Sequence, residues 1–141
     1  MAHSVSPRLE RFPTWCLSQA SARSHRVLHG HLAQAGASAY DFRVLAALGD
    51  LGQTSQAELS RAAALDRRDV THTARGLEAR HLVSRRRDPS DARQTLIELT
   101  GAGRSMLERL ESIVEDVQSE VFAPLTATQR ETFLELLQRL S

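Results

Sequence analysis

The sequence predicts a mainly α-helical protein with a small β-hairpin wing, and three features support this prediction. Two long segments, 14–34 and 101–121, repeat their apolar residues with a helical period. Between them, residues 53–100 have the pattern of two short helices, a tight turn between them, and a hairpin with a charged tip. Apolar residues make up 41% of the 141 residues and aromatic residues only 4%, so Leu, Ala and Val must fill the core. This layout is that of a winged helix-turn-helix flanked by further helices.

The chain begins with a polar arm followed by a helix. The arm covers residues 1–12, and its first few residues are expected to be disordered. The helix is expected to run from Thr14, as its N-cap, to about Gln34, and Gly36 is expected to end it.

A second helix is expected from Ser38 to about Leu48. Ser38 is a favoured N-cap residue, and Asp41 three positions later makes a capping-box variant with Asp in place of Glu. Residues 49–52 are then expected to form a turn, and residues 53–55 a short strand.

The next two helices form the helix-turn-helix. Ser55 and Glu58 make a Ser-x-x-Glu capping box for the first of them. Asp66 is expected to cap the second, which runs from Arg67 to about Arg80. The inward-facing residues of this second helix are expected to be Val70, Ala74 and Leu77.

A hairpin and two C-terminal helices complete the chain. Strands are expected at 82–87 and 93–99 around a turn at 88–91. Thr100 is expected to cap a long helix that Pro124 ends, and Thr126 opens a last helix with a second capping box. The long helix carries a spacing typical of a coiled-coil seam at Gly103, Leu107, Leu110, Val114, Val117 and Val121.

The outward face of the segment 67–80 is suited to DNA. Arg can bind guanine with two hydrogen bonds, Thr can contact a base, and His can bind a base edge or a phosphate. All 18 cationic residues of the chain are Arg, whose planar fork suits phosphates and guanine edges. The residues expected to face DNA are Arg67, Arg68, Thr71, His72 and Arg75.

The hairpin tip adds a second group of cations, which includes Arg87 and Arg93. A local ion pair with Asp91 can hold Arg93 extended, and an extended Arg at a loop tip fits a narrow minor groove. Ser55, at the start of a helix, is a further candidate for a phosphate contact.

Several motifs in this region belong together, and the most specific is Asp-Pro-x-Asp-x-Arg at 88–93 followed by Leu-Thr. The others are Gln56–Leu59, Leu65–Asp66, Val70–Thr71, Leu77–Glu78, Leu82–Arg85 and Leu99–Gly103. On these residues the segment 38–105 resembles the MarR family of bacterial transcription regulators.

The resemblance implies a homodimer that binds a pseudo-palindromic double-stranded DNA operator and responds to a small-molecule effector, commonly as a repressor. It also implies three parts. Residues 1–37 form an arm and a dimerisation helix, 38–100 the winged helix-turn-helix, and 101–141 the C-terminal dimerisation helices. By the same resemblance, Thr71, His72 and Arg75 contact bases, Arg67 and Arg68 lie nearer the backbone, and Arg93 enters the minor groove with Asp91 orienting it.

The sequence departs from the family pattern at three positions. Ala92 stands where the family has Arg, which removes one expected phosphate contact. His81 stands where a Gly closes the recognition helix in a left-handed conformation, which His adopts at a cost. Gly76 within the helix costs about 1 kcal/mol against Ala, and either allows a close approach of another backbone or leaves the helix more pliable.

The resemblance implies an effector site between the dimer helices and the winged helix. Trp15, His25, His29, Tyr40 and Arg43 are the candidates, and together they suit a small aromatic or anionic ligand. The alternative for Trp15 and Tyr40 is a place in the core or the dimer interface.

Two other sensing chemistries stay open. Cys16 lies near the start of the first long helix, as the reactive cysteine does in peroxide-sensing members of the family. One of the two tyrosines that partner this cysteine is absent here, and His29 stands near its place. His25 and His29 have a spacing that can chelate a metal, with His31 close by, but no local carboxylate or Cys completes a set. We therefore expect no metal site and no cofactor.

Composition and the absence of other motifs restrict the remaining possibilities. A single cysteine indicates a reducing compartment, and there is no membrane-span pattern or signal peptide, so a cytoplasmic protein is expected. No phosphate-binding loop or nucleophile motif indicates an enzyme. A net charge of +1 limits DNA binding to local basic patches, and leaves open a winged helix that binds a protein instead.

Overall fold

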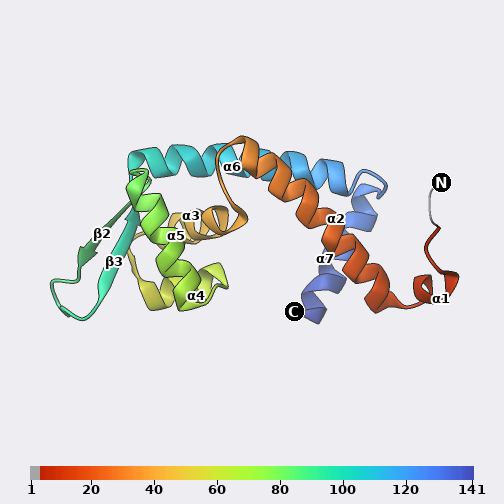
Figure 1. Cartoon of the computed structure of the whole chain (residues 1–141), viewed down its shortest axis with the longest axis horizontal. Helices are drawn as coiled ribbons and strands as arrows, with labels where there is room; N and C mark the ends of the chain where they lie inside the picture. The colour runs from red at the N-terminus through yellow and green to blue at the C-terminus, as the bar shows by residue number, and fades with distance from the viewer. Residues whose placement is uncertain (1–3) are drawn as a thin grey trace.

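Helix α6 (Gly101–Val121) runs along the length of the molecule and connects its two ends (Figure 1). This computed structural model describes residues 4–141, so residues 1–3, to which much of the expected disorder applies, lie outside the described range. The other elements are α1 (Pro7–Glu10), α2 (Pro13–Gln34), α3 (Ala39–Leu51), β1 (Thr54–Ser55), α4 (Gln56–Ala63), α5 (Arg67–Ala79), β2 (Val83–Arg87), β3 (Thr95–Leu99) and α7 (Ala127–Leu140).

The two ends of α6 carry different parts of the fold. Helices α3, α4 and α5 and the β2–β3 hairpin gather at one end, while α1, α7, most of α2 and both termini lie at the other (Figure 1). The expected winged helix-turn-helix with flanking helices is confirmed. In the described range 4–141, no helix combines the length and apolarity that a membrane crossing requires.

A three-stranded antiparallel sheet in the order β1-β3-β2 forms the wing. Val83 pairs with Leu99 and Thr54 with Ile97, which confirms the expected hairpin and short first strand. The return strand begins at Thr95 rather than at Arg93. The reason is a wider loop, which is closed by the Asp88 backbone N–H donating to the Gln94 carbonyl at 2.9 Å.

The core lies within the winged helix and against α6. Leu45 and Leu48 of α3, Leu59 of α4 and Ile97 of β3 are each at most 1% exposed. The expected inner stripe of α5 is confirmed by the burial of Val70, Ala74 and Leu77.

Most expected helix starts are confirmed by their hydrogen bonds. The complete capping boxes are those of Ser38 with Asp41 and Thr126 with Gln129. Asp66 and Thr100 cap α5 and α6 through the backbone N–H three residues on.

Three local expectations were wrong. Ser55 caps α4, but the carboxylate of Glu58 accepts from the Thr54 hydroxyl at 2.7 Å instead of closing the box. Thr14 lies inside α2, which begins at Pro13, because proline is favoured in the first turn of a helix. Helix α3 extends to Leu51, so the expected turn at 49–52 shrinks to its last residue.

The seam of α6 is used within the chain. Leu107 and Leu110 belong to the protein's own core, and a Cβ on Gly103 would lie 1.9 Å from the Leu82 carbonyl oxygen. Most of the residues with the coiled-coil spacing therefore pack within the protomer. The spacing reflects packing of α6 on the winged helix and α2.

Helix α7 has no buried residue. Its exposed apolar side chains are Leu134, Leu136 and Leu140, with exposed fractions of 56%, 52% and 75%. A groove of about 520 Å³ separates α7 from the first turns of α2, and its lining is almost entirely apolar. This end of the molecule thus leaves an apolar surface uncovered.

Candidate nucleic-acid interface

Helix α5 exposes a cationic row on the side that faces away from the core. Arg68, His72 and Arg75 are exposed and spaced at i, i+4 and i+7, so they follow one another along a single face. Three of the five residues expected to face DNA on this helix therefore form one continuous surface.

Thr71 lies on the flank of this row that faces α4. Its hydroxyl donates to the Arg67 carbonyl at 2.8 Å and accepts from the side-chain amide of Gln56. A hydroxyl has one proton, so that of Thr71 is already used within the protein. This role of Gln56 was missed from the sequence, because its partner lies 15 positions away in another helix.

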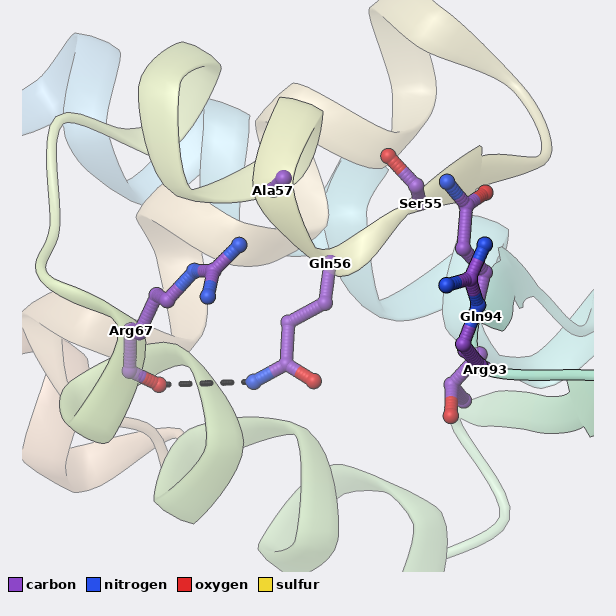
Figure 2. Close-up of a pocket in the computed structure, with 7 residues that line it drawn as sticks. Ser55, Gln56, Ala57, Arg67, Arg93 and Gln94 are labelled. Atoms are coloured by element: carbon purple, nitrogen blue, oxygen red, sulfur yellow. Dashed lines mark hydrogen bonds between the residues drawn. The ribbon is translucent and has the colours of Figure 1, made fainter.

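A pocket of about 230 Å³ lies between the start of α4, the start of α5 and the segment 93–95, where the wing loop enters β3 (Figure 2). Ser55, Arg67 and Arg93, which the sequence assigned to three separate elements, all line it. Gln56 crosses the pocket floor and donates to the Arg67 carbonyl at 3.4 Å (Figure 2). Two guanidinium groups and the N-terminus of α4 thus meet at one concavity, a combination that suits an anion such as a phosphate.

Arg93 and Asp91 form the expected ion pair. Asp91 Oδ1 accepts from Arg93 Nε at 3.2 Å and from the Arg93 backbone N–H at 3.0 Å. The Arg93 side chain is nevertheless 91% exposed. The carboxylate therefore restricts the direction of an arginine that remains free to meet a partner.

The wing turn is built by Asp88. Its carboxylate accepts from the backbone N–H of Ser90 at 2.8 Å and from the Ser90 hydroxyl at 2.6 Å. These hydrogen bonds lower the pKa of Asp88 below its ordinary 3.8. The turn is therefore fixed by its own side chains and presents Arg93 at a defined place.

The three arginines of β2 have different surroundings. Arg85 donates to Glu78 of α5 at 2.9 Å, and this bond lowers the pKa of Glu78 below 4.5. Arg86 reaches Gln53 at 3.4 Å, while Arg87, the one assigned to DNA, is exposed. The first of these contacts ties the wing to the recognition helix.

Two non-glycine residues close the helices of the motif in the left-handed conformation. His81 has a φ of +60°, as the family pattern implied for this position, and Ala64 at the end of α4 has a φ of +52°. The Ala64 turn lies between the two helices of the motif and was not expected from the sequence.

Arg43 holds the turn between α4 and α5. Its Nε donates to the Ala63 carbonyl at 2.9 Å, and its Nη2 donates to the Ala64 carbonyl. The guanidinium also lies 5.7 Å from the centre of the Tyr40 ring. Arg43 thus has a structural role that the assignment to an effector pocket did not include.

The structure does not bring the five candidate effector residues together within one protomer. Trp15 lies near the start of α2 and Tyr40 lies beyond its end, and the 20 residues from Trp15 to Gln34 span about 28 Å of helix. His25 and His29 stack at 5.4 Å between ring centres on the exposed side of α2. A site that included all five would need a second protomer.

The remaining candidates for sensing are Cys16 and the histidines of α2. Cys16 is exposed, lines the groove beside α7, and donates to the Glu10 carbonyl at 3.2 Å. His31 Nε2 lies 2.8 Å from Glu120 Oε2 of α6, so its ring is engaged with α6 rather than with His25 and His29. Within residues 4–141, no group of three or more metal-ligating side chains is found.

Comparison with known proteins agrees with this geometry. Residues 38–95 match the model of the MarR family. The chain is 34% identical over 99 residues to the HTH-type transcriptional repressor NicR of Pseudomonas putida, covering 70% of this chain. It spans only 63% of the length of NicR.

Two further similarities extend over more of the length of the similar protein. The HTH-type transcriptional repressor Mb2911 of Mycobacterium bovis is 31% identical over 109 residues, which cover 77% of this chain and 78% of Mb2911. The structure of BpsR from Bordetella bronchiseptica, whose DNA binding is regulated by 6-hydroxynicotinic acid, superposes with a TM-score of 0.81 at 29% identity, covering 89% of this chain and 95% of BpsR. The chain therefore belongs to the MarR family of winged-helix transcription regulators.

Proposed function

We propose that this protein is a dimeric repressor that binds a pseudo-palindromic DNA operator and is released from it by a small aromatic or anionic ligand. The observation that carries the proposal is the meeting of the α5 row with the wing. Arg68, His72 and Arg75 are exposed on the helix, and Arg67 and Arg93 line one pocket beside it. A helix in the major groove with an arginine reaching the neighbouring minor groove uses this arrangement.

Each residue has a proposed task. Arg68, His72 and Arg75 reach base edges or the flanking strands from the exposed row of α5. Ser55 and Arg67 hold a backbone phosphate at the pocket, while Asp91 orients Arg93 toward the minor groove. Arg87 adds a cation along the wing. Thr71 contributes its methyl group and its contact with Gln56, because its hydroxyl proton is bonded within the protein.

The uncovered apolar end supports the homodimer. Leu9, Phe12 and Leu17 of the N-terminal part are 39%, 47% and 44% exposed, and Leu17 lines the groove shared with the leucines of α7. Apolar patches of this kind mark interaction sites on soluble proteins. In this proposal residues 1–37 and 101–141 join two protomers, and residues 38–100 bind DNA. A two-fold dimer then requires half-sites about one helical turn, 10 bp, apart.

The proposed effector class rests on the residues around α2 and α3 and on one relative. Trp15, Tyr40 and the histidines of α2 offer aromatic walls, and Arg43 offers a cation. BpsR responds to 6-hydroxynicotinic acid, an aromatic acid. An effector releases DNA only if it binds the DNA-incompetent arrangement more tightly than the competent one.

The decisive experiment selects bound fragments from the genome of origin and measures affinity for the selected operator in gel shifts at several salt concentrations. We expect a steep fall of affinity with salt, because phosphate contacts release counterions. Candidate aromatic acids are then added to the complex, and release is expected for at least one. Failure to bind any duplex, random DNA at low salt included, would refute the proposal and favour a winged helix that binds an acidic protein.

A further inference from the structure

No contact within the protomer requires a glycine at position 76. A Cβ built on it meets no atom within 4 Å, whereas one on Gly103 would lie 1.9 Å from the Leu82 carbonyl oxygen. Its backbone is ordinary α5 helix, where glycine is one of the least favourable residues. The chain thus accepts a weaker recognition helix at a position where an alanine fits without contact.

The place of Gly76 on α5 is next to the cationic row. It is exposed and follows His72 by four residues, which places it about 40° further around the helix. It lies on the flank away from Thr71, whose side chain faces α4. Arg67 and Thr71 therefore border the row on one side, and Asp69 and the bare backbone of Gly76, two turns later, border it on the other.

An α-helix nearly fills the width of the DNA major groove. A helix with its side chains is about 10–12 Å in diameter, and the groove is about 12 Å wide. Both flanks of a seated helix therefore lie close to the groove walls. Removing the side chain from one flank allows the helix to move toward that wall or deeper between the strands.

We infer that Gly76 is a point of close approach between the recognition helix and the operator, and that a side chain there prevents the helix from seating fully. This inference rests on the proposed function. It makes Gly76 a residue that determines the fit to DNA, although it carries no donor or charge.

The test compares Gly76→Ala and Gly76→Leu with the same pair at Gly30, using the full-length protein and the selected operator. Gly30 is the matched control, because it is also exposed, within a helix and without an atom within 4 Å of a built Cβ. Alanine and leucine both favour a helix more than glycine does, so all four variants should raise the midpoint of thermal unfolding by a few degrees or leave it unchanged.

At Gly76 we expect operator affinity to fall about tenfold for Ala and about a hundredfold for Leu, the range that overfilling a fitted space produces. The Gly30 pair reports the effect of the same two side chains on an exposed helix outside the segment proposed to bind DNA, and sedimentation checks that the Gly30 variants stay dimeric before their affinities are compared. Unchanged affinity in both Gly76 variants would overturn the inference. Equal losses for Ala and Leu would also overturn it, since they would indicate a need for a pliable helix rather than for space.

The same series separates this inference from the proposed function. If the unchanged protein binds no duplex, the proposed function fails and the inference fails with it. If the unchanged protein binds its operator and the Gly76 variants bind equally well, only the inference fails.

Discussion

At the level of single residues, the wing shows how a charged side chain can be directed without being buried. Asp91 bonds both the backbone and the side chain of Arg93, yet leaves that side chain 91% exposed. An exposed ion pair contributes little to folding, about 0–1 kcal/mol. The pair therefore serves direction more than stability, which separates its effect on binding from its effect on the fold.

Replacing Arg93 by Ala should weaken operator binding by about 1–3 kcal/mol, because a directed cation is lost. The free energy of unfolding should change by less than about 0.5 kcal/mol, as for other surface substitutions. Gel-shift titration and urea unfolding measure the two quantities. Arg109→Ala, which removes an equal charge from the exposed side of α6, is the control and should leave affinity nearly unchanged.

A second residue-scale prediction concerns His81, whose φ of +60° is unfavourable for a side chain. His81→Gly should raise the free energy of unfolding by up to about 1 kcal/mol, the relief of strain being partly offset by the greater freedom of glycine when unfolded. Gly52→Ala, at a φ of +68°, should have the opposite sign. A loss of stability in His81→Gly measured by urea unfolding would contradict the assignment of strain.

At the level of elements, α5 is held at both ends by long-range polar contacts. Arg43 bonds the turn that leads into it, Glu78 joins it to β2, and Arg80 lies 3.7 Å from Asp41 of α3. These contacts set the direction of the recognition helix relative to the wing. Their loss should therefore change DNA binding even where no DNA-facing residue is altered.

The Glu78–Arg85 pair predicts a pH dependence. Because Arg85 lowers the folded-state pKa of Glu78 below 4.5, the pair stabilises the fold above that value, and the contribution is lost as pH falls through the folded-state pKa. Glu78 is 40% exposed, so the effect should be about 0.5 kcal/mol or less.

Urea unfolding of the unchanged protein and Glu78→Gln between pH 7 and pH 3 measures this effect. The variant should be less stable at pH 7, and the difference should shrink as the pH falls toward 3. Glu115→Gln on the exposed side of α6 should show no such convergence. A constant difference between pH 7 and pH 3 would mean that the ion pair is not the cause.

At the level of the whole molecule, the winged helix has a closed core while the opposite end does not. Leu136 lines the groove beside α7 and is 52% exposed. In the proposed homodimer this surface is covered, and the two winged helices are held at a spacing that matches the operator.

Leu136→Glu should therefore dissociate the dimer, because an unpaired charge is costly in an apolar interface. We expect the dissociation constant to rise at least about a hundredfold, with operator affinity falling because two half-sites are no longer bound together. Sedimentation and gel shifts measure both. Leu51→Glu, at a leucine 45% exposed on the winged helix, is the control and should remain dimeric. A Leu136→Glu protein that stays dimeric would place the interface elsewhere.

The residues that DNA is proposed to meet were largely identifiable from sequence, since they lie on the outer face of a periodic helix or at a hairpin tip. The exposed row of α5 and the Asp91–Arg93 pair both follow from spacing. The roles of Thr71, Gln56 and Arg43 could not be predicted from spacing, because each depends on a partner outside its own helix. The effector site was the least predictable part, since its candidate residues on α2 and α3 lie far apart in the protomer.

The sequence by itself determined what depends on residues within about one turn of each other. The capping boxes at Ser38 and Thr126, the buried stripe of α5 and the hairpin are of this kind. Only the tertiary structure decided that the seam of α6 packs within the chain and that α7 remains bare. The physical reason is that an apolar stripe specifies burial but not the surface that buries it, and that surface is set by how the helices pack.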